Sequence, residues 1–418
     1  MSERSGTIGG MRLRVYLDVL RKPSVSRLLG SAVVGRMPTA MAGLAIVLLV
    51  REAGGSYAVA GLVAGAYSIA LALTSPLLGR LVDRVGQTRV LVGSAAASAL
   101  SFGALAAAGR SASPAVLAVL AALAGASIPP VAACMRALWS ELLGHGGQLQ
   151  AAFAVESTVQ ELIFVIGPPL VALLAAVFSP AAAVLGTGAL LLIGVGVFAA
   201  TPASRAWRGQ RRAADWAGPL RSRGIRAVLA SIVLLAGAFG IVEVTVVADA
   251  EQLGSRTLAG PLLALWAAGS MIGGLAFGSR ASDRGPEQRM IGLLFLVVAG
   301  IALLAVAGGL VQLGAGMVLA GLGIAPAIAC LYLLVDRLAP AGTVTEAFTW
   351  VTTAFATGFA VGNALGGTLV QQVGIDAAFL IAAGGVAAAA LLARLRRHAL
   401  AAPPAGMPET WEGLGRAG

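Results

Sequence analysis

Long apolar stretches alternate with short polar segments along the whole chain. Windows of about 19 residues predict membrane spans near residues 28–50, 57–78, 90–109, 114–138, 152–178, 181–200, 227–249, 258–278, 290–308, 311–335, 347–370 and 377–393. A bilayer core of about 30 Å needs roughly 20 apolar residues per spanning helix, and these stretches have that length. The pattern therefore predicts an all-α integral membrane protein with twelve transmembrane helices.

The basic residues give an independent test of this topology, because a missed span would invert the side of every later loop. With the N-terminus inside, 25 of the 29 basic residues fall in cytoplasmic segments. The predicted outside loops hold only Arg51, Arg110 and Arg256. The split predicts a multi-pass protein of a bacterial-type plasma (inner) membrane with both termini in the cytoplasm. The first apolar run lacks a small-residue cleavage site, so we expect it to remain as the first helix.

One polar segment near the middle divides the chain into two similar parts. Residues 201–226 contain seven arginines together with Pro202, Gly209 and Pro219, which are typical of a linker. We therefore expect a cytoplasmic N-terminal segment, a first six-helix bundle, a linker, a second six-helix bundle and a disordered cytoplasmic tail. Their predicted bounds are 1–27, 28–200, 201–226, 227–393 and 394–418.

Composition excludes several other classes of protein. Of the 418 residues, 58% are apolar and 11% are charged, and the mean hydropathy is +0.90; a soluble domain has about 25% charged residues. The net charge of +11 does not indicate nucleic-acid binding, because the chain lacks long polar faces. Its one lysine, Lys22, precedes a proline and forms no P-loop. Two scattered histidines and the apolar Cys134 and Cys330 predict no metal site and no cofactor.

The two parts of the chain repeat each other at offsets near 200 residues, which drift from 199 at the first matched pair to 195 at the last. The pair Asp83-Arg84 recurs as Asp283-Arg284, and the matches continue through the following spans. Further matched pairs are Ala60-Gly61 and Ala259-Gly260, Arg89 and Arg289, Pro130 and Pro326, Cys134 and Cys330, Ala152-Phe153 and Ala347-Phe348, and Gly167 and Gly362. This order indicates two pseudo-symmetric six-helix bundles of common ancestry.

The loop between the second and third spans carries a recognisable motif. Residues 79–89 read GRLVDRVGQTR, and a degenerate copy, GSRASDRGPEQR, occupies residues 278–289 between the eighth and ninth spans. The motif, its position and the repeat resemble those of the major facilitator superfamily, over roughly residues 25–395. The resemblance implies that substrate binds between the two bundles and that the bundles rock against each other.

The resemblance also suggests that the motif loop is a latch. Gly79 permits close helix approach, and Asp83 can face the positive N-terminal end of a neighbouring helix. Arg84 and Arg89 can pair with carboxylates. In the second copy the matching charges are Asp283, Arg284 and Arg289. Contacts formed in only one state would bias the equilibrium between inward-facing and outward-facing forms; the alternative is that these charges only anchor a loop.

Four ionisable residues lie inside predicted spans: Arg36, Glu156, Glu161 and Glu243. Such residues are costly in a bilayer and are functional candidates. Depth counting places Arg36 level with Glu161. A carboxyl group in a partly dry cavity holds a proton more readily, so Glu161, Glu243 or Glu156 is a candidate for proton coupling. Arg36 is then its counter-ion or a substrate anchor; the alternatives are a structural ion pair between the first and fifth helices and, for Glu156, a place at the membrane interface.

Further candidates follow from position. We expect Arg136 and Glu141, at the end of the fourth span, to join Asp83 and Arg84 in a gating cluster of four charges. Arg337 and Glu346 hold comparable places in the second bundle. Tyr67 and Trp350 are the aromatic candidates for the substrate cavity.

Two glycine-rich segments complete the picture. Gly167-Pro168-Pro169 partly resembles a glycine–proline motif of drug and proton antiporters, although the closing glycines are replaced by Ala172 and Leu173. Small residues in the eleventh span form a stripe that is ordinarily a helix-packing surface. Its members are Gly358, Gly362, Gly366 and Gly367.

These features together predict a secondary active transporter that functions as a monomer and has a small molecule, protons and the lipid bilayer as its partners. The favoured function is proton-coupled efflux of a drug-like compound or metabolite. The first alternative is proton-driven import of a sugar or carboxylate, with Arg36 as the substrate anchor. A channel or a membrane-embedded enzyme is the remote alternative, because no nucleophile or metal cluster supports an enzyme.

Overall fold

The computed structural model describes residues 23–109, 112–144, 146–208, 217–253, 258–278 and 284–401. These residues form helices joined by short turns and no strand. Twelve helical segments in this part of the chain are long and apolar enough to cross a membrane. The predicted number of spans is confirmed.

The first six spans contain eight long helices, because two of the spans are broken at prolines. Span 1 is interrupted at Met37, before Pro38, and span 4 is interrupted around Pro129 and Pro130, since proline removes a backbone donor. The helices are α2 (Pro23–Arg36), α3 (Pro38–Glu52), α4 (Tyr57–Val85), α5 (Gln87–Ala108), α6 (Pro114–Ala126), α7 (Val131–Leu143), α8 (Gly147–Val177) and α9 (Pro180–Ala200).

The second six spans are continuous helices. They are α11 (Arg223–Gln252), α12 (Ala259–Gly278), α13 (Pro286–Leu304), α14 (Leu310–Leu338), α15 (Val344–Val373) and α16 (Ile375–Leu395). Between the two sets lie the short helix α10 (Pro202–Ala206) and the 3₁₀ turn η2 (Gly218–Arg221). The short helix α17 (Arg397–Ala401) follows α16.

Local sequence explains where these helices begin and end. Ser56, Ser179 and Ser222 each accept a hydrogen bond from a backbone N–H in the first turn of the helix that follows, which satisfies a free donor. Gly86 (φ 95°) and Gly374 (φ 87°) adopt the left-handed backbone that ends α4 and α15. Tight turns between apolar helices are therefore encoded by single polar or glycine residues.

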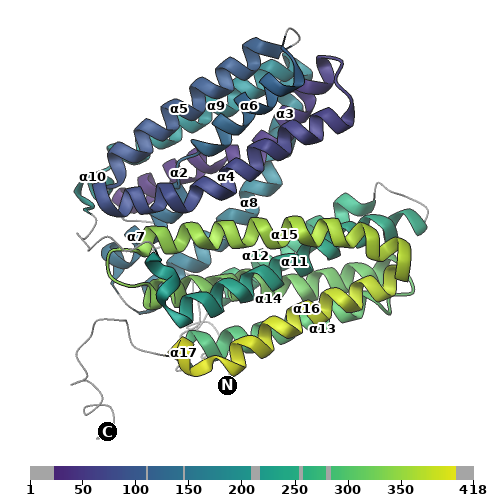
Figure 1. The fold of residues 1–418 in the computed structure, drawn as a ribbon. Coiled ribbons are helices and arrows are strands. Elements are labelled where there is room, and N and C mark those ends of the chain that lie inside the picture. The colour runs from purple at the N-terminus through teal and green to yellow at the C-terminus, as the bar shows by residue number, and fades with distance from the viewer. Residues whose placement is uncertain are drawn as a thin grey trace, which may run out of the picture.

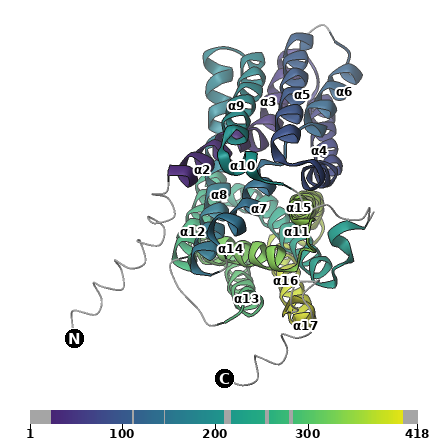
Figure 2. The same ribbon diagram turned by 90° about the vertical axis from the view of Figure 1, so that its left-hand side faces the viewer.

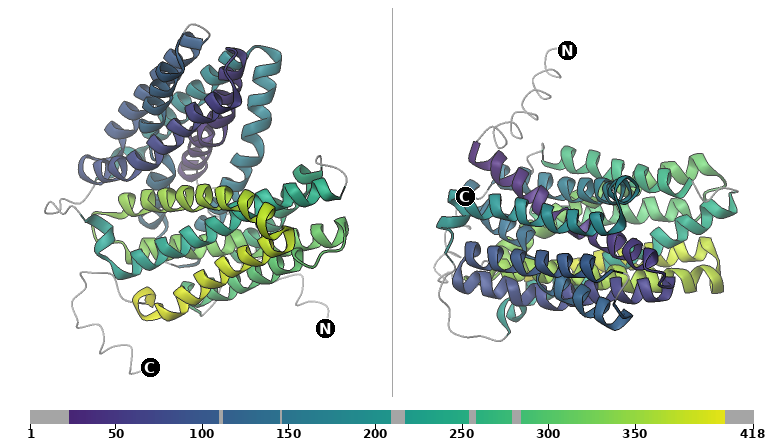
Figure 3. Two further views of the ribbon diagram at one scale, coloured as in Figure 1. Left: turned by 45° about the vertical axis from the view of Figure 1, so that its right-hand side comes forward. Right: turned by 90° about the horizontal axis from the view of Figure 1, so that it is seen from above.

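The helices form two bundles that meet at one end. Helices α2 to α9 make the first bundle and α11 to α16 the second, and Figure 1 and Figure 3 show the two approaching each other near α7 and α10 and diverging toward the opposite end. Across the boundary α4 and α7 pack on α15, and α8 packs on α12 and α14; Figure 2 views this junction end-on. We call the end that carries α10, η2 and α17 the linker end.

Glycines set the closest helix contacts of the second bundle. A Cβ added to Gly358, Gly362 or Gly366 would meet the backbone of α11, so this part of the predicted stripe packs α15 against α11. Gly367 has no atom of another helix within 4 Å of such a Cβ and lies outside the contact. In the first bundle a Cβ on Gly167 would lie 2.7 Å from the methyl group of Ala40. The glycine–proline segment is therefore a packing point between α8 and α3.

Two predicted segments differ from expectation. Residues 394–401, expected to be disordered, are helical: α16 runs to Leu395 and α17 buries Leu400. The carbonyl of Ala401 accepts a hydrogen bond from Arg337, which holds α17 on the linker end. Residues 402–418 lie outside the described residues. The predicted linker also begins and ends with helical structure, in α10 and η2.

Candidate functional site

Arg36 is the last residue of α2 and directly precedes the interruption of the first span at Met37. Its guanidinium pairs with the carboxylate of Glu156 and donates a hydrogen bond to the side-chain oxygen of Gln160, both on α8. Glu156 and Gln160 are four residues apart and share one face of the helix. Arg36 is 2% exposed and Glu156 is fully buried. A charged pair thus joins the first and fifth spans inside the bundle.

The expected partner of Arg36 was Glu161, and this pairing is wrong. Depth counting ignores direction around the helix: five residues turn an α-helix by about 140°. Glu156 therefore faces α2, whereas Glu161 points toward the second bundle. The i, i+4 spacing of Glu156 and Gln160 was the sequence signal that favoured the correct face.

Arg136 of α7 completes the charged site. Its Nε lies 3.7 Å from Oε1 of Glu156, and its guanidinium carbon lies 4.0 Å from the ring centre of Tyr332 on α14. The ring centre of Phe348 on α15 is 6.0 Å away. We call Arg36, Glu156 and Arg136 the Arg–Glu–Arg cluster. Sequence reasoning treated Arg136 as a gating residue and missed its place in this cluster.

Several polar atoms of the Arg–Glu–Arg cluster have no hydrogen-bond partner. These atoms are Nε of Arg36, Nε of Arg136 and Oε2 of Glu156, and all three are buried. Buried polar groups are normally paired. The cluster therefore retains unused capacity for donating and accepting hydrogen bonds.

Glu161 lies at the boundary between the two bundles. Its carboxylate accepts a hydrogen bond of 3.1 Å from the hydroxyl of Ser270 on α12, and Ser270 is 1% exposed. The adjacent turn of α8 is also in close contact with α12, because a Cβ on Gly274 would lie 2.8 Å from the hydroxyl of Thr158. Separation of the bundles would remove the Ser270 hydrogen bond from Glu161.

The remaining predicted site residues lie in three different places. Glu243, on α11, is half-buried. Tyr67 is 3% exposed and packs inside the first bundle, with its ring centre 6.0 Å from that of Phe102. Trp350 of α15 is partly buried, and its indole nitrogen has no hydrogen-bond partner. In the part of the chain that the structure describes, no hydrogen bond or ion pair joins any of these three to the Arg–Glu–Arg cluster.

The motif loop of the first bundle contacts the start of α15. Asp83, which is 3% exposed, accepts hydrogen bonds from the backbone N–H groups of Thr345 (3.1 Å) and Glu346 (2.7 Å). A carboxylate at a helix N-terminus is stabilised by the free donors and the helix dipole. Gly79 allows this approach, because a Cβ there would collide with Thr349. The geometry is that of a contact between bundles that has to break when the linker end opens.

An arginine that the sequence analysis did not select strengthens this contact. Arg80 forms two hydrogen bonds with the carboxylate of Glu346, of 3.1 Å from Nε and 2.6 Å from Nη2. The two parallel bonds are the strong bidentate form of the arginine–carboxylate pair. We call Gly79, Arg80, Asp83 and Glu346 the latch. Arg80 occupies a variable position of the motif, so the motif pattern itself gave no reason to choose it.

The expected cluster of Asp83, Arg84, Arg136 and Glu141 does not form. Arg84 and Arg89 are exposed, and no ion pair involves either among the described residues. Glu141 is also exposed and has the Trp207 side chain as its hydrogen-bond partner. Arg136 instead faces the bundle interior, because the residues between it and Glu141 turn the helix to a different face.

The second motif copy makes a different contact across the boundary. Arg289 donates a hydrogen bond of 2.8 Å to the side-chain oxygen of Gln150 on α8, and its guanidinium carbon lies 3.8 Å from the ring centre of Phe277. Gln150 also donates to the carbonyl of Phe277. Asp283 lies outside the described residues, and Arg284 is exposed. Arg337 does not pair with Glu346 but lies 3.8 Å from Glu287.

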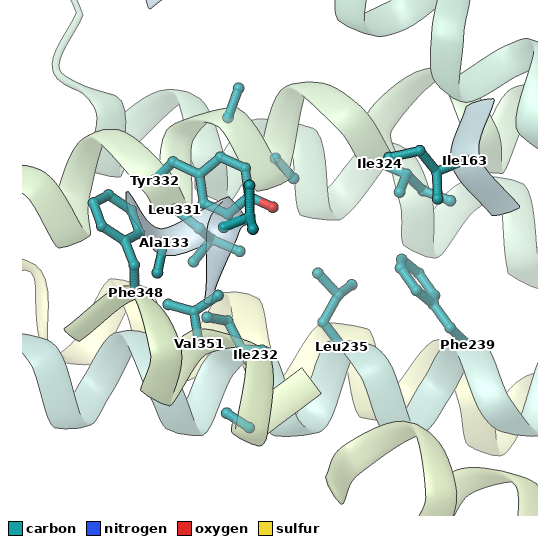
Figure 4. Packing of buried hydrophobic residues seen from close by; sticks show 14 of the residues in the cluster. Ala133, Ile163, Ile232, Leu235, Phe239, Ile324, Leu331, Tyr332, Phe348 and Val351 are labelled. Carbon is teal, nitrogen blue, oxygen red and sulfur yellow. The ribbon is translucent and has the colours of Figure 1, made fainter. Parts of the chain in front are cut away.

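Aromatic side chains close the boundary beside the Arg–Glu–Arg cluster. Phe153, Tyr332 and Phe348 come from α8, α14 and α15, and their ring centres are 5.9 to 6.2 Å apart. Figure 4 shows Tyr332 and Phe348 together against Ala133 of α7. With the latch and the Arg289 contact, these rings hold the two bundles together at the linker end. The structure is therefore closed at the linker end.

Comparison with known proteins agrees with this architecture. Residues 28–353 and 229–416 match the family model described as Major Facilitator Superfamily. No curated protein sequence matches the chain. The human organic anion transporter MFSD10 (TETRAN) is similar in structure, with a TM-score of 0.68, 20% identity, and coverage of 89% of this chain and 99% of that chain.

Two bacterial structures are similar to the same extent. A bacterial homologue of the iron transporter ferroportin, in an outward-facing state, has a TM-score of 0.71, 16% identity, and coverage of 89% of this chain and 99% of its own. The E. coli fucose:proton symporter FucP has a TM-score of 0.69, 14% identity, and coverage of 90% and 99%. At these identities the similarity concerns the fold.

Proposed function

Because the chain belongs to the Major Facilitator Superfamily and is thus a multi-pass membrane transporter rather than an enzyme, we propose that it carries a small organic molecule by alternating access and that protons drive the transport. In this proposal the protein acts as a monomer in a bacterial-type plasma membrane. The linker end faces the cytoplasm, as the distribution of basic residues predicts. The structure then corresponds to the outward-facing state, because the linker end is closed.

The hydrogen bond from Ser270 to Glu161 is the observation that carries the proton coupling. A carboxyl group between two bodies that separate has a different environment in each state, so its affinity for a proton differs between them. A ligand that binds two states unequally shifts the equilibrium between them. Proton binding at Glu161 is therefore linked to the movement of the bundles.

For the direction of transport we propose export in exchange for protons. The glycine–proline segment, which partly resembles that of drug and proton antiporters, supports this direction. One structural observation favours the second candidate, which is proton-driven import of a carboxylate. The Arg–Glu–Arg cluster holds two positive charges against one negative charge.

Reconstitution into proteoliposomes with an imposed pH gradient tests the proposal. A panel of labelled drugs, sugars and carboxylates identifies a transported compound and the direction of its accumulation. Glu161→Gln should abolish gradient-driven accumulation. Exchange of labelled for unlabelled compound should persist, because exchange carries the compound in both directions without net transfer of protons. Glu243→Gln is the matched control and should keep accumulation. Accumulation by Glu161→Gln at the wild-type level would contradict the role of Glu161, and its loss in Glu243→Gln alone would transfer that role to Glu243.

A further inference from the structure

The Arg–Glu–Arg cluster has an excess of positive charge. Arginine remains protonated in proteins, so Arg36 and Arg136 carry two charges, and Glu156 is the carboxylate in ion-pair contact with either guanidinium among the described residues. All three side chains are 3% exposed or less. An uncompensated charge in this setting is costly, and such charges in membrane proteins mark binding sites or transport pathways.

The hydrogen bonds of the cluster leave donors unused that a second anion can accept from. Glu156 contacts both arginines through Oε1, while its Oε2 and the Nε of each arginine have no hydrogen-bond partner. A guanidinium has five N–H donors in a planar fork that matches a carboxylate. The two arginines therefore have more donors than one glutamate uses.

The cover over the cluster comes from the other bundle. Tyr332 and Phe348 lie over the guanidinium of Arg136, and both belong to the second bundle, whereas all three cluster residues belong to the first. When the bundles separate at the linker end, these two rings move away with α14 and α15. Arg136 then faces the opened space, with the apolar ring of Phe153 on its own side of the boundary.

We propose that the Arg–Glu–Arg cluster is the substrate site for the carboxylate of a small organic anion, formed when the linker end opens. The anion's carboxylate accepts hydrogen bonds from Arg136 and Arg36, and its apolar body lies against Phe153. Glu156 holds the two arginines in place when no substrate is bound. The inference rests on the proposed alternating access, and it specifies the charge class of the substrate, whichever direction the substrate moves.

Two sets of isosteric probes test the charge class without knowledge of the natural substrate. Benzoate, benzamide and benzamidinium share one ring, and butyrate, butyramide and butyramidinium share one chain, so each set differs only in its head group, which is anionic, neutral or cationic. The concentration dependence of the unfolding temperature of the purified protein measures binding. We expect each carboxylate to bind roughly tenfold or more tightly than its amide, because charge-assisted hydrogen bonds exceed neutral ones, and the amidinium compounds not to bind.

Substitutions locate the binding to the cluster. Arg136→Gln and Arg36→Gln should each weaken carboxylate binding roughly tenfold or more without changing amide binding. Arg51→Gln is the matched control, since Arg51 lies on the same span as Arg36 but is exposed at the opposite end. Glu156→Gln should bind the carboxylates at least as tightly as wild type, because a competing negative charge is removed. If the arginine variants do not fold, the Glu156→Gln result and the probe series decide the question.

Three results would overturn the site: amides that bind as tightly as the carboxylates, carboxylate binding in Arg136→Gln at the wild-type level, or a weaker carboxylate affinity in folded Glu156→Gln.

Failure of the proposed function is measured separately. Thr349 is buried under Gly79 of the other bundle, so Thr349→Cys, in a chain with Cys134→Ala and Cys330→Ala, reacts with a maleimide only when the linker end opens. If Thr349→Cys is labelled but the probes show no preference for the carboxylates, the anion site is refuted and alternating access is retained. If Thr349→Cys is not labelled, alternating access is refuted.

Discussion

Equivalent positions of the two bundles carry different chemistry. The repeat offsets of 196 residues for the fourth and tenth spans and 195 residues for the fifth and eleventh pair Arg136 with Tyr332 and Glu156 with Val351. In each pair the first bundle has the charge, and the second has an aromatic or aliphatic side chain. Duplication has kept the backbone arrangement, but the three charges of the Arg–Glu–Arg cluster all lie in the first bundle. The second bundle supplies the aromatic rings that cover Arg136, and its own buried carboxylate, Glu346, belongs to the latch.

Helix packing also differs between the bundles, and here the second bundle has the closer contact. Gly167 and Gly362 are equivalent, and their nearest neighbours are Ala40 on α3 and Gly237 on α11. In the second bundle backbone lies against backbone, whereas in the first a methyl group separates the helices. The looser contact leaves room between the first and fifth spans for the side chains of Arg36, Glu156 and Gln160. At this pair of equivalent glycines the closer packing lies in the bundle that lacks the buried charge site.

The largest expected effect comes from removing one member of the Arg–Glu–Arg cluster. Arg36→Val leaves Glu156 as a buried carboxylate without its main partner, and loss of one partner from a buried pair costs about 3–5 kcal/mol. The matched glycine contacts give Arg36 and Val233 equivalent positions, so the triple variant Arg36→Val, Glu156→Val, Arg136→Tyr gives the first bundle the residues of the second. We expect its stability to return to within about 1 kcal/mol of wild type, with transport lost. Chemical unfolding and proteoliposome flux measure the two properties.

The single and triple variants control each other. A triple variant that is less stable than Arg36→Val would show that the cluster is needed for folding and would remove the basis for the comparison between bundles. A stable triple variant that still transports the compound would show that the cluster is dispensable for transport.

The next effect concerns the two equivalent glycines. Gly362→Ala places a methyl group against the backbone of Gly237, which cannot yield without separating the helices, so we expect a loss of about 3 kcal/mol, at the upper end for overpacking. Gly167→Ala meets the methyl group of Ala40 at 2.7 Å, with the backbone of Ala40 further away at 3.3 and 3.4 Å, and should cost about 1 kcal/mol.

Gly367→Ala is the control for this pair, because no atom of another helix lies within 4 Å of the added methyl group. It should be neutral or stabilising, since alanine favours helix more than glycine does. Thermal unfolding of the three variants in one detergent ranks them. Equal losses for Gly167→Ala and Gly362→Ala would contradict the difference in packing.

The sequence predicted the fold better than the site, for a physical reason. The bilayer requires every span to be apolar and keeps most arginines on one side of the membrane. Hydropathy and the positions of the arginines therefore predicted twelve helices in two bundles. Pairing of side chains depends on direction around each helix and on helix tilt, which hydropathy windows do not report. Arg36 was therefore assigned to Glu161 instead of Glu156.

Contacts between the bundles were the hardest to predict. The role of Asp83 followed from the motif, because the motif's position relative to the helix ends is fixed. Arg80 and Glu346 are far apart in the sequence and belong to different bundles, and no local pattern connects them. The contact of Gln150 with Arg289 escaped prediction for the same reason.

The smallest effects should come from single polar contacts among those that hold the linker end closed. Asp83→Asn removes a negative charge from the N-terminus of α15, where such a charge is worth up to about 2 kcal/mol, and this shifts the equilibrium toward the open linker end by roughly thirtyfold. Arg289→Gln removes a hydrogen bond to the neutral Gln150, worth about 1 kcal/mol, and should shift the equilibrium about fivefold. The rate of maleimide labelling at Thr349→Cys measures both shifts. If Arg289→Gln accelerates labelling more than Asp83→Asn does, closure depends mainly on the second motif copy, and the charges of the first bundle do not dominate the closed state.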